Sequence, residues 1–196
     1  MGLFGKTKTY DFETVTTKGG DSGQSSLYNE RREYKDSARF TLIGELDELQ
    51  SLIGLMRARF DNNSTVPLLR EIQERLYDYM SIVATESDSE LYEALKKPQE
   101  SHIEKIEINQ KKFLDSTDIP QKFIIPGDGN EVSAWLDYIR TVIRQNERAC
   151  VHFIRSVDIY TSKRIDFDDM KLIQKYLNRL SDYFFIVARY LEQEVD

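Results

Sequence analysis

Apolar residues recur at alternating steps of three and four along most of this chain, a spacing that places them on one side of an α-helix. In the first such segment, from Asp36 to Phe60, they are Leu42, Leu46, Leu49, Ile53, Met56 and Phe60. The same rhythm continues from Thr65 to Glu86, from Glu131 to Val157 and from Asp168 to Glu194. The pattern therefore predicts four long helices, each with one buried face.

The segment from residue 87 to 116 is more polar and is divided by Pro98, because proline cannot continue a helix. A short helical piece around Leu91 and Leu95 precedes the proline, and a longer helix carrying Ile103, Ile106, Gln110 and Phe113 follows it. Residues 119–130, "IPQKFIIPGDGN", predict an extended connector. Long helices with short links pack economically as an up-and-down bundle. We therefore predict an all-α, up-and-down five-helix bundle, ferritin-like in appearance.

Chain length and composition limit the number of domains and the classes of partner. A chain of 196 residues with 40% hydrophobic content can build one substantial core, so we expect a single domain over residues 1–196. Within it, residues 1–35 form an N-terminal arm and residues 36–196 the bundle. The net charge of -7 argues against nucleic acid as a partner.

Cysteine content and hydropathy bear on the compartment. The single cysteine, Cys150, excludes an intrachain disulfide and a cysteine-rich metal site, which suits a reducing compartment. No stretch approaches the length of an apolar membrane span, and the first residues lack the core of a signal peptide. We therefore expect a cytoplasmic protein that makes no use of a membrane.

One polar stretch, "TTKGGDSGQSSL" at residues 16–27, does not fit the helical pattern. Its glycines leave backbone N–H groups free to curl around an anion, while Lys18 and several serines add donors. It is not a Walker A loop, because Gly23 is followed by Gln24 rather than by lysine. The alternative is a mobile polar arm without a ligand.

A second candidate for anion binding lies in the helix predicted from residue 131. Arg140, Arg144, Glu147 and Arg148 follow each other at i, i+4, i+7 and i+8, so they share one helix face. Three guanidinium groups in a row suit a polyphosphate. The alternative is a solvated surface in which Glu147 pairs with its neighbours. Triad hydrolysis is not indicated, because no GxSxG motif or Cys–His pairing exists.

Seven stretches, in this order and spacing, resemble the PduO-type ATP:cob(I)alamin (corrinoid) adenosyltransferases. They are "TKGGDSG" at 17–23, "YKDSARF" at 34–40, "GELDELQSLIG" at 44–54, "IQERLYD" at 72–78, "FIIPG" at 123–127, "RTVIRQNER" at 140–148 and "YLNRLSDYFFIVAR" at 176–189. The resemblance implies an enzyme that moves the 5′-deoxyadenosyl group of ATP to cob(I)alamin, giving adenosylcobalamin and triphosphate. An alternative is a catalytically weak member that carries or senses ATP and cobalamin.

The resemblance also assigns roles to individual residues. Those matching the family's ATP site are Thr17, Lys18, Gly20, Asp21, Gly23, Lys35, Arg140, Arg144, Glu147, Arg148 and Asn178. Asp47 matches an aspartate that pairs across a subunit interface with the residue matching Arg140. Phe123 matches an aromatic residue that covers the lower face of the corrin ring. The catalytic set implied is Arg140, Arg144, Phe123 and Asp47.

Further partners follow from the same resemblance. It implies a homotrimer with ATP sites between neighbouring subunits, a Mg²⁺ ion that accompanies ATP, and transient contacts with a flavin-type reductase and a B12-dependent enzyme. No residues are assigned to the metal. The chain departs from the family pattern at Gln145, where arginine is usual, and at Asp128, where glycine is usual. We expect Gln145 to remove one guanidinium group from the triphosphate site.

Overall fold

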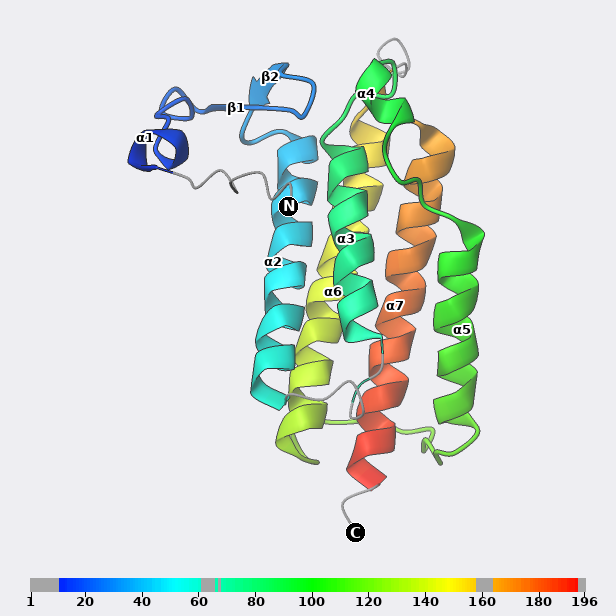
Figure 1. Ribbon diagram of the computed structural model, residues 1–196. Helices are drawn as coiled ribbons and strands as arrows, with labels where there is room; N and C mark the ends of the chain where they lie inside the picture. The colour runs from blue at the N-terminus through cyan, green and yellow to red at the C-terminus, as the bar shows by residue number, and fades with distance from the viewer. Residues whose placement is uncertain (1–10, 61–65, 67, 158–163, 194–196) are drawn as a thin grey trace, which may run out of the picture.

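The structure is a computed structural model that describes residues 11–60, 66, 68–157 and 164–193. Within these ranges the fold is mostly helical, as predicted (Figure 1). The longer helices are α2 (Ala38–Phe60), α3 (Leu69–Val83), α5 (Glu100–Leu114), α6 (Glu131–Ser156) and α7 (Phe167–Gln193). Two one-turn helices, α1 (Phe12–Val15) and α4 (Glu90–Glu93), and two short strands complete the described elements.

The longer helices lie side by side, and the chain reverses direction from each one to the next (Figure 1). Helix α6 packs against α2 on one side and against α7 on the other, while α3 packs on α2 and α5 on α7. The contact between α3 and α7 includes an edge-to-face pair of Tyr79 and Tyr176, with ring centroids 5.2 Å apart. Helix α6 is therefore covered on two sides by its neighbours.

The helix boundaries follow local signals in the sequence. Helix α6 begins with a capping box, in which Ser133 N donates to Asn130 Oδ1 at 2.9 Å and Asn130 N donates to Ser133 Oγ at 3.1 Å. Helix α5 begins two residues after Pro98, as predicted. The predicted helix start at Thr65 lies outside the described residues, and α3 begins at Leu69.

The core is formed by the predicted apolar faces. The predicted positions of α2 from Leu42 to Met56 are buried, as are Ile173, Leu177 and Leu180 on α7. Phe60 and Val132 are only partly buried and pack against the edge of the core. Each large apolar side chain removed from water stabilises the fold by about 1.5–3 kcal/mol, so these faces account for the way the helices associate.

The N-terminal arm contains a β-hairpin that was not predicted from the sequence. Strands β1 (Gln24–Ser26) and β2 (Arg32–Tyr34) pair antiparallel, with Ser25 opposite Glu33. The connecting turn places Glu30 at a φ of 65°, and Leu27 N donates to Arg31 O at 2.7 Å. The strands are short and polar, so they carry no alternation of apolar residues that could have identified them. In Figure 1 the arm projects sideways from the end of the bundle where α2 begins.

None of the described helices is both long enough and apolar enough to cross a membrane.

Cys150 provides a test of how tightly α6 is packed. The side chain is fully buried, and burial raises the pKa of its thiol to about 12. Because the thiolate is the reactive form, the native protein should react with a thiol reagent at pH 8 far more slowly than the urea-unfolded protein. The folded pKa lies above the unfolded one, so the associated stability should be complete below about pH 8.5 and decline at higher pH. Equal labelling rates in buffer and in urea would contradict this burial.

Candidate functional site

The glycine-rich stretch forms a compact loop of successive turns. Asp21 N donates to Lys18 O and Gly23 N donates to Gly20 O, each at 3.2 Å. Gly23 has a φ of 80°, a left-handed conformation that glycine adopts without strain. Lys35 N donates to Gly23 O at 2.9 Å, which ties the loop to the residue that follows β2. Thr17, Lys18 and Asp21 are exposed on this loop.

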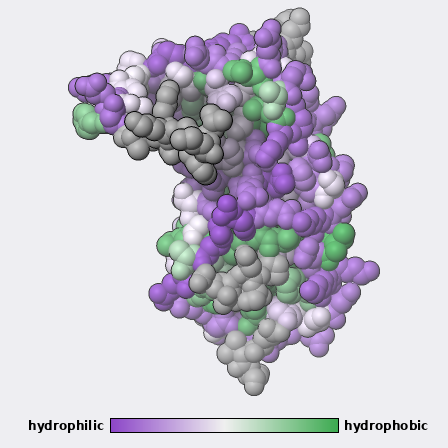
Figure 2. Space-filling model, viewed as in Figure 1, coloured by the Kyte–Doolittle hydropathy of each residue, from purple (hydrophilic) through white to green (hydrophobic). Residues whose placement is uncertain are grey.

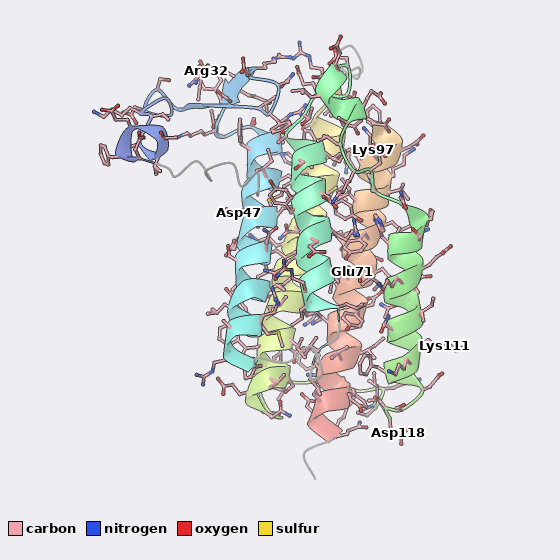
Figure 3. All side chains as sticks on the ribbon, in the orientation of Figure 1. Arg32, Asp47, Glu71, Lys97, Lys111 and Asp118 are labelled. Carbon is pink, nitrogen blue, oxygen red and sulfur yellow. The ribbon has the colours of Figure 1, made fainter. Side chains whose placement is uncertain are left out.

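Two cationic side chains lie against the loop. A Cβ atom at Gly20 would stand 2.7 Å from Lys35 Nζ, so the absence of a side chain there lets the ammonium group approach the backbone. Arg32 on β2 donates to Gly19 O at 2.6 Å and to Gln24 O at 3.2 Å (Figure 3). The structure thus brings Gly20, Gly23 and Lys35 together, and it adds Arg32, which the sequence analysis missed because the hairpin was not predicted.

The arm is fixed to the bundle through the segment that follows α3. The carboxylate of Glu86 accepts hydrogen bonds from Arg31 and, at 3.0 Å, from Asn29 Nδ2. Tyr28 N donates to Ala84 O at 2.8 Å. The buried Arg39 donates to Val83 O at 2.7 Å and has its Nε 3.3 Å from Glu33 of β2. These contacts hold the hairpin, and with it the glycine loop, at one end of the bundle.

A hollow of about 430 Å³ lies along α6. Its lining among the described residues is Arg144, Glu147, Arg148, Val151, His152 and Arg155. Glu147 accepts a hydrogen bond from Asn178 Nδ2 of α7 at 3.1 Å. The predicted site residues Arg144, Glu147, Arg148 and Asn178 are therefore gathered on one face.

The arginines of the hollow differ from the others in their pairing. Every other arginine has an ion-pair or hydrogen-bond partner within the protein, namely Arg31, Arg32, Arg39, Arg57, Arg59, Arg70, Arg75, Arg140, Arg164, Arg179 and Arg189. Among the residues that the structure describes, Arg144, Arg148 and Arg155 have no ion-pair or hydrogen-bond partner. A guanidinium is a permanent cation with five N–H donors. The hollow is therefore suited to an anion that supplies the missing acceptors.

Three of the predicted catalytic residues, Asp47, Phe123 and Arg140, do not line this hollow in the single chain. Asp47 is exposed on α2 (Figure 3), and the carboxylate paired with Arg140 is that of Asp137, 3.5 Å from Arg140 Nε. Phe123 is 89% exposed in the connector before α6, at the end of the bundle opposite the arm (Figure 1). An exposed aromatic ring of this kind is available to a ligand or to another chain.

The structure gives Gln145 a different setting from the one expected. Its Nε2 donates to both carboxylate oxygens of Glu45 on α2, at 2.8 and 2.7 Å. Gln145 is thus directed toward α2 and does not line the hollow that contains Arg144 and Arg148. Arginine at position 145 would meet Glu45 first, because an oppositely charged carboxylate is already within reach.

Buried charge stabilises the first half of α6. Arg189 of α7 donates to Asp137 at 2.6 Å and to Glu192 at 2.7 Å, and both members of the Asp137–Arg189 pair are almost fully buried. In the described ranges, no three His, Cys, Asp or Glu residues gather in a group that could hold a metal ion. Figure 2 shows a largely hydrophilic surface on which apolar side chains form scattered patches.

Known proteins resemble this chain over nearly its whole length. The family model for cobalamin adenosyltransferase matches residues 15–191. The corrinoid adenosyltransferase of Bacillus subtilis (strain 168) is 34% identical over 178 residues, covering 88% of this chain and 83% of that protein. Corrinoid adenosyltransferase MMAB of Homo sapiens is 31% identical over 188 residues, covering 94% and 71%. A solved variant of the PduO-type ATP:corrinoid adenosyltransferase from Lactobacillus reuteri, complexed with cobalamin and ATP, has a TM-score of 0.77 at 32% identity, with 91% of each chain covered.

The close approach of Lys35 to Gly20 can be tested with a single methyl group. In Gly20→Ala the new Cβ would displace the Lys35 ammonium group rather than the backbone, because Nζ is the end of a flexible side chain. If that group binds an anion, affinity for tripolyphosphate should fall about tenfold, as expected for one charge-assisted bond, with little change in melting temperature.

Gly44→Ala is the matched control, since a Cβ there meets nothing within 4 Å. It should retain full affinity, measured by isothermal titration calorimetry. Equal affinities for the two variants would remove Lys35 from the anion site.

Proposed function

Since this chain belongs to the cobalamin adenosyltransferase family, we propose that its glycine loop and the hollow along α6 bind ATP for the adenosylation of a corrinoid. The reaction moves the 5′-deoxyadenosyl group of ATP to cobalamin. The observation that carries the assignment of the site is the absence of protein partners for Arg144 and Arg148 in the described chain, beside the Glu147–Asn178 hydrogen bond.

The chemistry assigns charge stabilisation, rather than proton transfer, to the protein. The cobalt of cob(I)alamin is the nucleophile and donates an electron pair to C5′ of ATP. The Co–C bond forms as the C5′–O bond breaks, and the bonding pair leaves with triphosphate. No general base is required. Cationic donors placed at the departing oxygens lower the barrier, because they bind the leaving group more strongly as its charge develops.

We assign the triphosphate to residues from two parts of the chain. The loop residues Thr17, Lys18, Gly20, Asp21 and Gly23, together with Lys35, would cover it from the arm, and Arg144 and Arg148 would hold it from α6. Asn178 and Glu147 are joined by a hydrogen bond, so they would present fixed polar groups to the nucleotide. Fixed donors align ATP before the reaction, so less entropy is lost when the transition state forms.

We place the corrinoid beside Phe123. The ring of Phe123 is exposed, and an apolar face against the lower side of the corrin would exclude water from cobalt. In one chain this residue and the glycine loop lie at opposite ends of the bundle (Figure 1). A homotrimer with sites between subunits would resolve that separation, with Asp47 of one subunit and Arg140 of its neighbour at the interface. We also propose that the fold is a five-helix, ferritin-like bundle and that the N-terminal arm binds the nucleotide.

Other components of the proposal follow from the reaction. Mg²⁺ would enter with ATP, because it is usually held by substrate phosphates and water with few protein ligands. Cob(I)alamin requires a strong reductant, so a flavin-type reductase would supply the electron and a B12-dependent enzyme would receive the product. We place the protein in the cytoplasm, consistent with the buried, unpaired Cys150.

The proposed function is tested by single-turnover formation of the Co–C bond. Enzyme, MgATP and chemically reduced cob(I)alamin are mixed, and the absorbance of adenosylcobalamin is followed. The wild-type protein should form stoichiometric product, whereas a carrier or sensor would bind both substrates and form none.

Removal of one guanidinium group tests the role assigned to α6. In Arg144→Ala the rate of Co–C bond formation should fall about tenfold or more, because a charge-assisted bond to triphosphate contributes about 1.5–3 kcal/mol. The control is Arg70→Ala, which removes an exposed arginine on α3 that pairs with Glu74. Wild-type rates in both variants would exclude the hollow as the triphosphate site.

A further inference from the structure

We propose that Arg155 extends the anion site of α6 and makes it selective for the length of the phosphate chain. The inference rests on the proposed function and adds a residue beyond the motif that ends at Arg148. Arg155 lines the same hollow as Arg144 and Arg148 and, like them, has no partner within the described chain. It lies close to the end of α6 and is exposed.

The position of Arg155 on the helix accounts for this shared environment. Arg144, Arg148, Val151 and Arg155 follow at i, i+4, i+7 and i+11, which keeps them in one stripe of an α-helix. At a rise of 1.5 Å per residue, Arg144 and Arg148 lie about 6 Å apart along the axis, and Arg155 lies about 10 Å beyond Arg148. The stripe therefore offers a pair of close guanidinium groups and a third one farther along.

The local charges favour an anion at the outer position as well. The carboxylate that lines the hollow, Glu147, is engaged by Asn178. His152 lies between Arg148 and Arg155 and adds a polar group to the hollow, and its side chain is exposed. Without a bound anion, the charge of Arg155 would gain little from lying in a hollow, because exposed charges are already well hydrated.

The spacing leads to a preference between ligands. A short phosphate chain can be held by Arg144 and Arg148 alone. A longer chain also brings acceptors within reach of the flexible Arg155 side chain, which then adds a charge-assisted hydrogen bond. Arg155 should thus contribute to binding of a triphosphate and little to binding of a diphosphate. For the reaction, this would favour ATP over ADP as the adenosyl donor.

The test compares the affinities of pyrophosphate and tripolyphosphate in wild-type protein and in Arg155→Gln, by isothermal titration calorimetry. The expected result is a loss of about tenfold for tripolyphosphate and less than threefold for pyrophosphate. Arg155→Lys, which keeps the charge but not the fork of donors, should recover part of the tripolyphosphate affinity. Arg70→Gln is the control and should leave both affinities unchanged.

The possible outcomes are distinct. Equal loss for the two anions, or no loss for either, would overturn the role in length selection. Wild-type Co–C bond formation combined with unchanged anion affinities in Arg155→Gln would refute this inference and leave the proposed function standing. A wild-type protein that shows the expected affinities but forms no Co–C bond would refute the proposed function and leave length selection by Arg155 standing.

Discussion

The packing of α6 between α2 and α7 is the constraint on which the rest of the structure depends. Its apolar residues, such as Ile139, Ile143 and Cys150, are completely buried, so the opposite side of the helix must face outward. The buried pair Asp137–Arg189 fixes α6 to α7, and loss of one partner from such a pair typically costs about 3–5 kcal/mol. The rotation of α6 about its own axis is thereby set, and with it the direction of the unpaired arginines.

The same arrangement accounts for the position of the glycine loop. Arg39, near the start of α2, lies with its guanidinium 5.1 Å from the ring centroid of Phe153 on α6 and donates to Val83 at the end of α3. Glu86 then binds Arg31 and Asn29 of the hairpin region. Both proposed phosphate-binding parts are thus attached to one rigid framework of helices, although the loop has little apolar surface of its own. Rigid support of this kind favours catalysis by placement, since the donors need not reorganise.

Sequence periodicity was sufficient to predict the longer helices, because each buries a continuous apolar face such as that from Leu42 to Met56. The hairpin was missed because its strands are polar and are stabilised by contacts with distant residues, of which Glu86 is one. The same limit applies to Gln145, whose contact with Glu45 spans 100 positions of the chain.

The residues of the candidate site could be predicted from the sequence where they belong to a recognisable motif. Arg144 and Arg148 belong to a recognisable stretch, and the structure places both on the hollow. Arg155 continues their stripe at i+11, a signal present in the sequence, yet only the absence of a protein partner in the described chain distinguishes it from an ordinary surface arginine. The roles proposed for Phe123 and Asp47 involve a corrinoid and a second subunit, so they lie beyond any pattern within one chain.

The unpaired arginines of α6 are proposed to bind the phosphates of ATP. The most direct measurement is a titration with MgATP followed by NMR of the arginine Nε–H groups, assigned by substitution with lysine. We expect large shifts for Arg144 and Arg148, and little change for Arg70 and Arg179, whose Nε–H groups donate to Glu74 and Glu107 within the protein. Unchanged Arg144 and Arg148 signals at saturating MgATP would contradict this proposal.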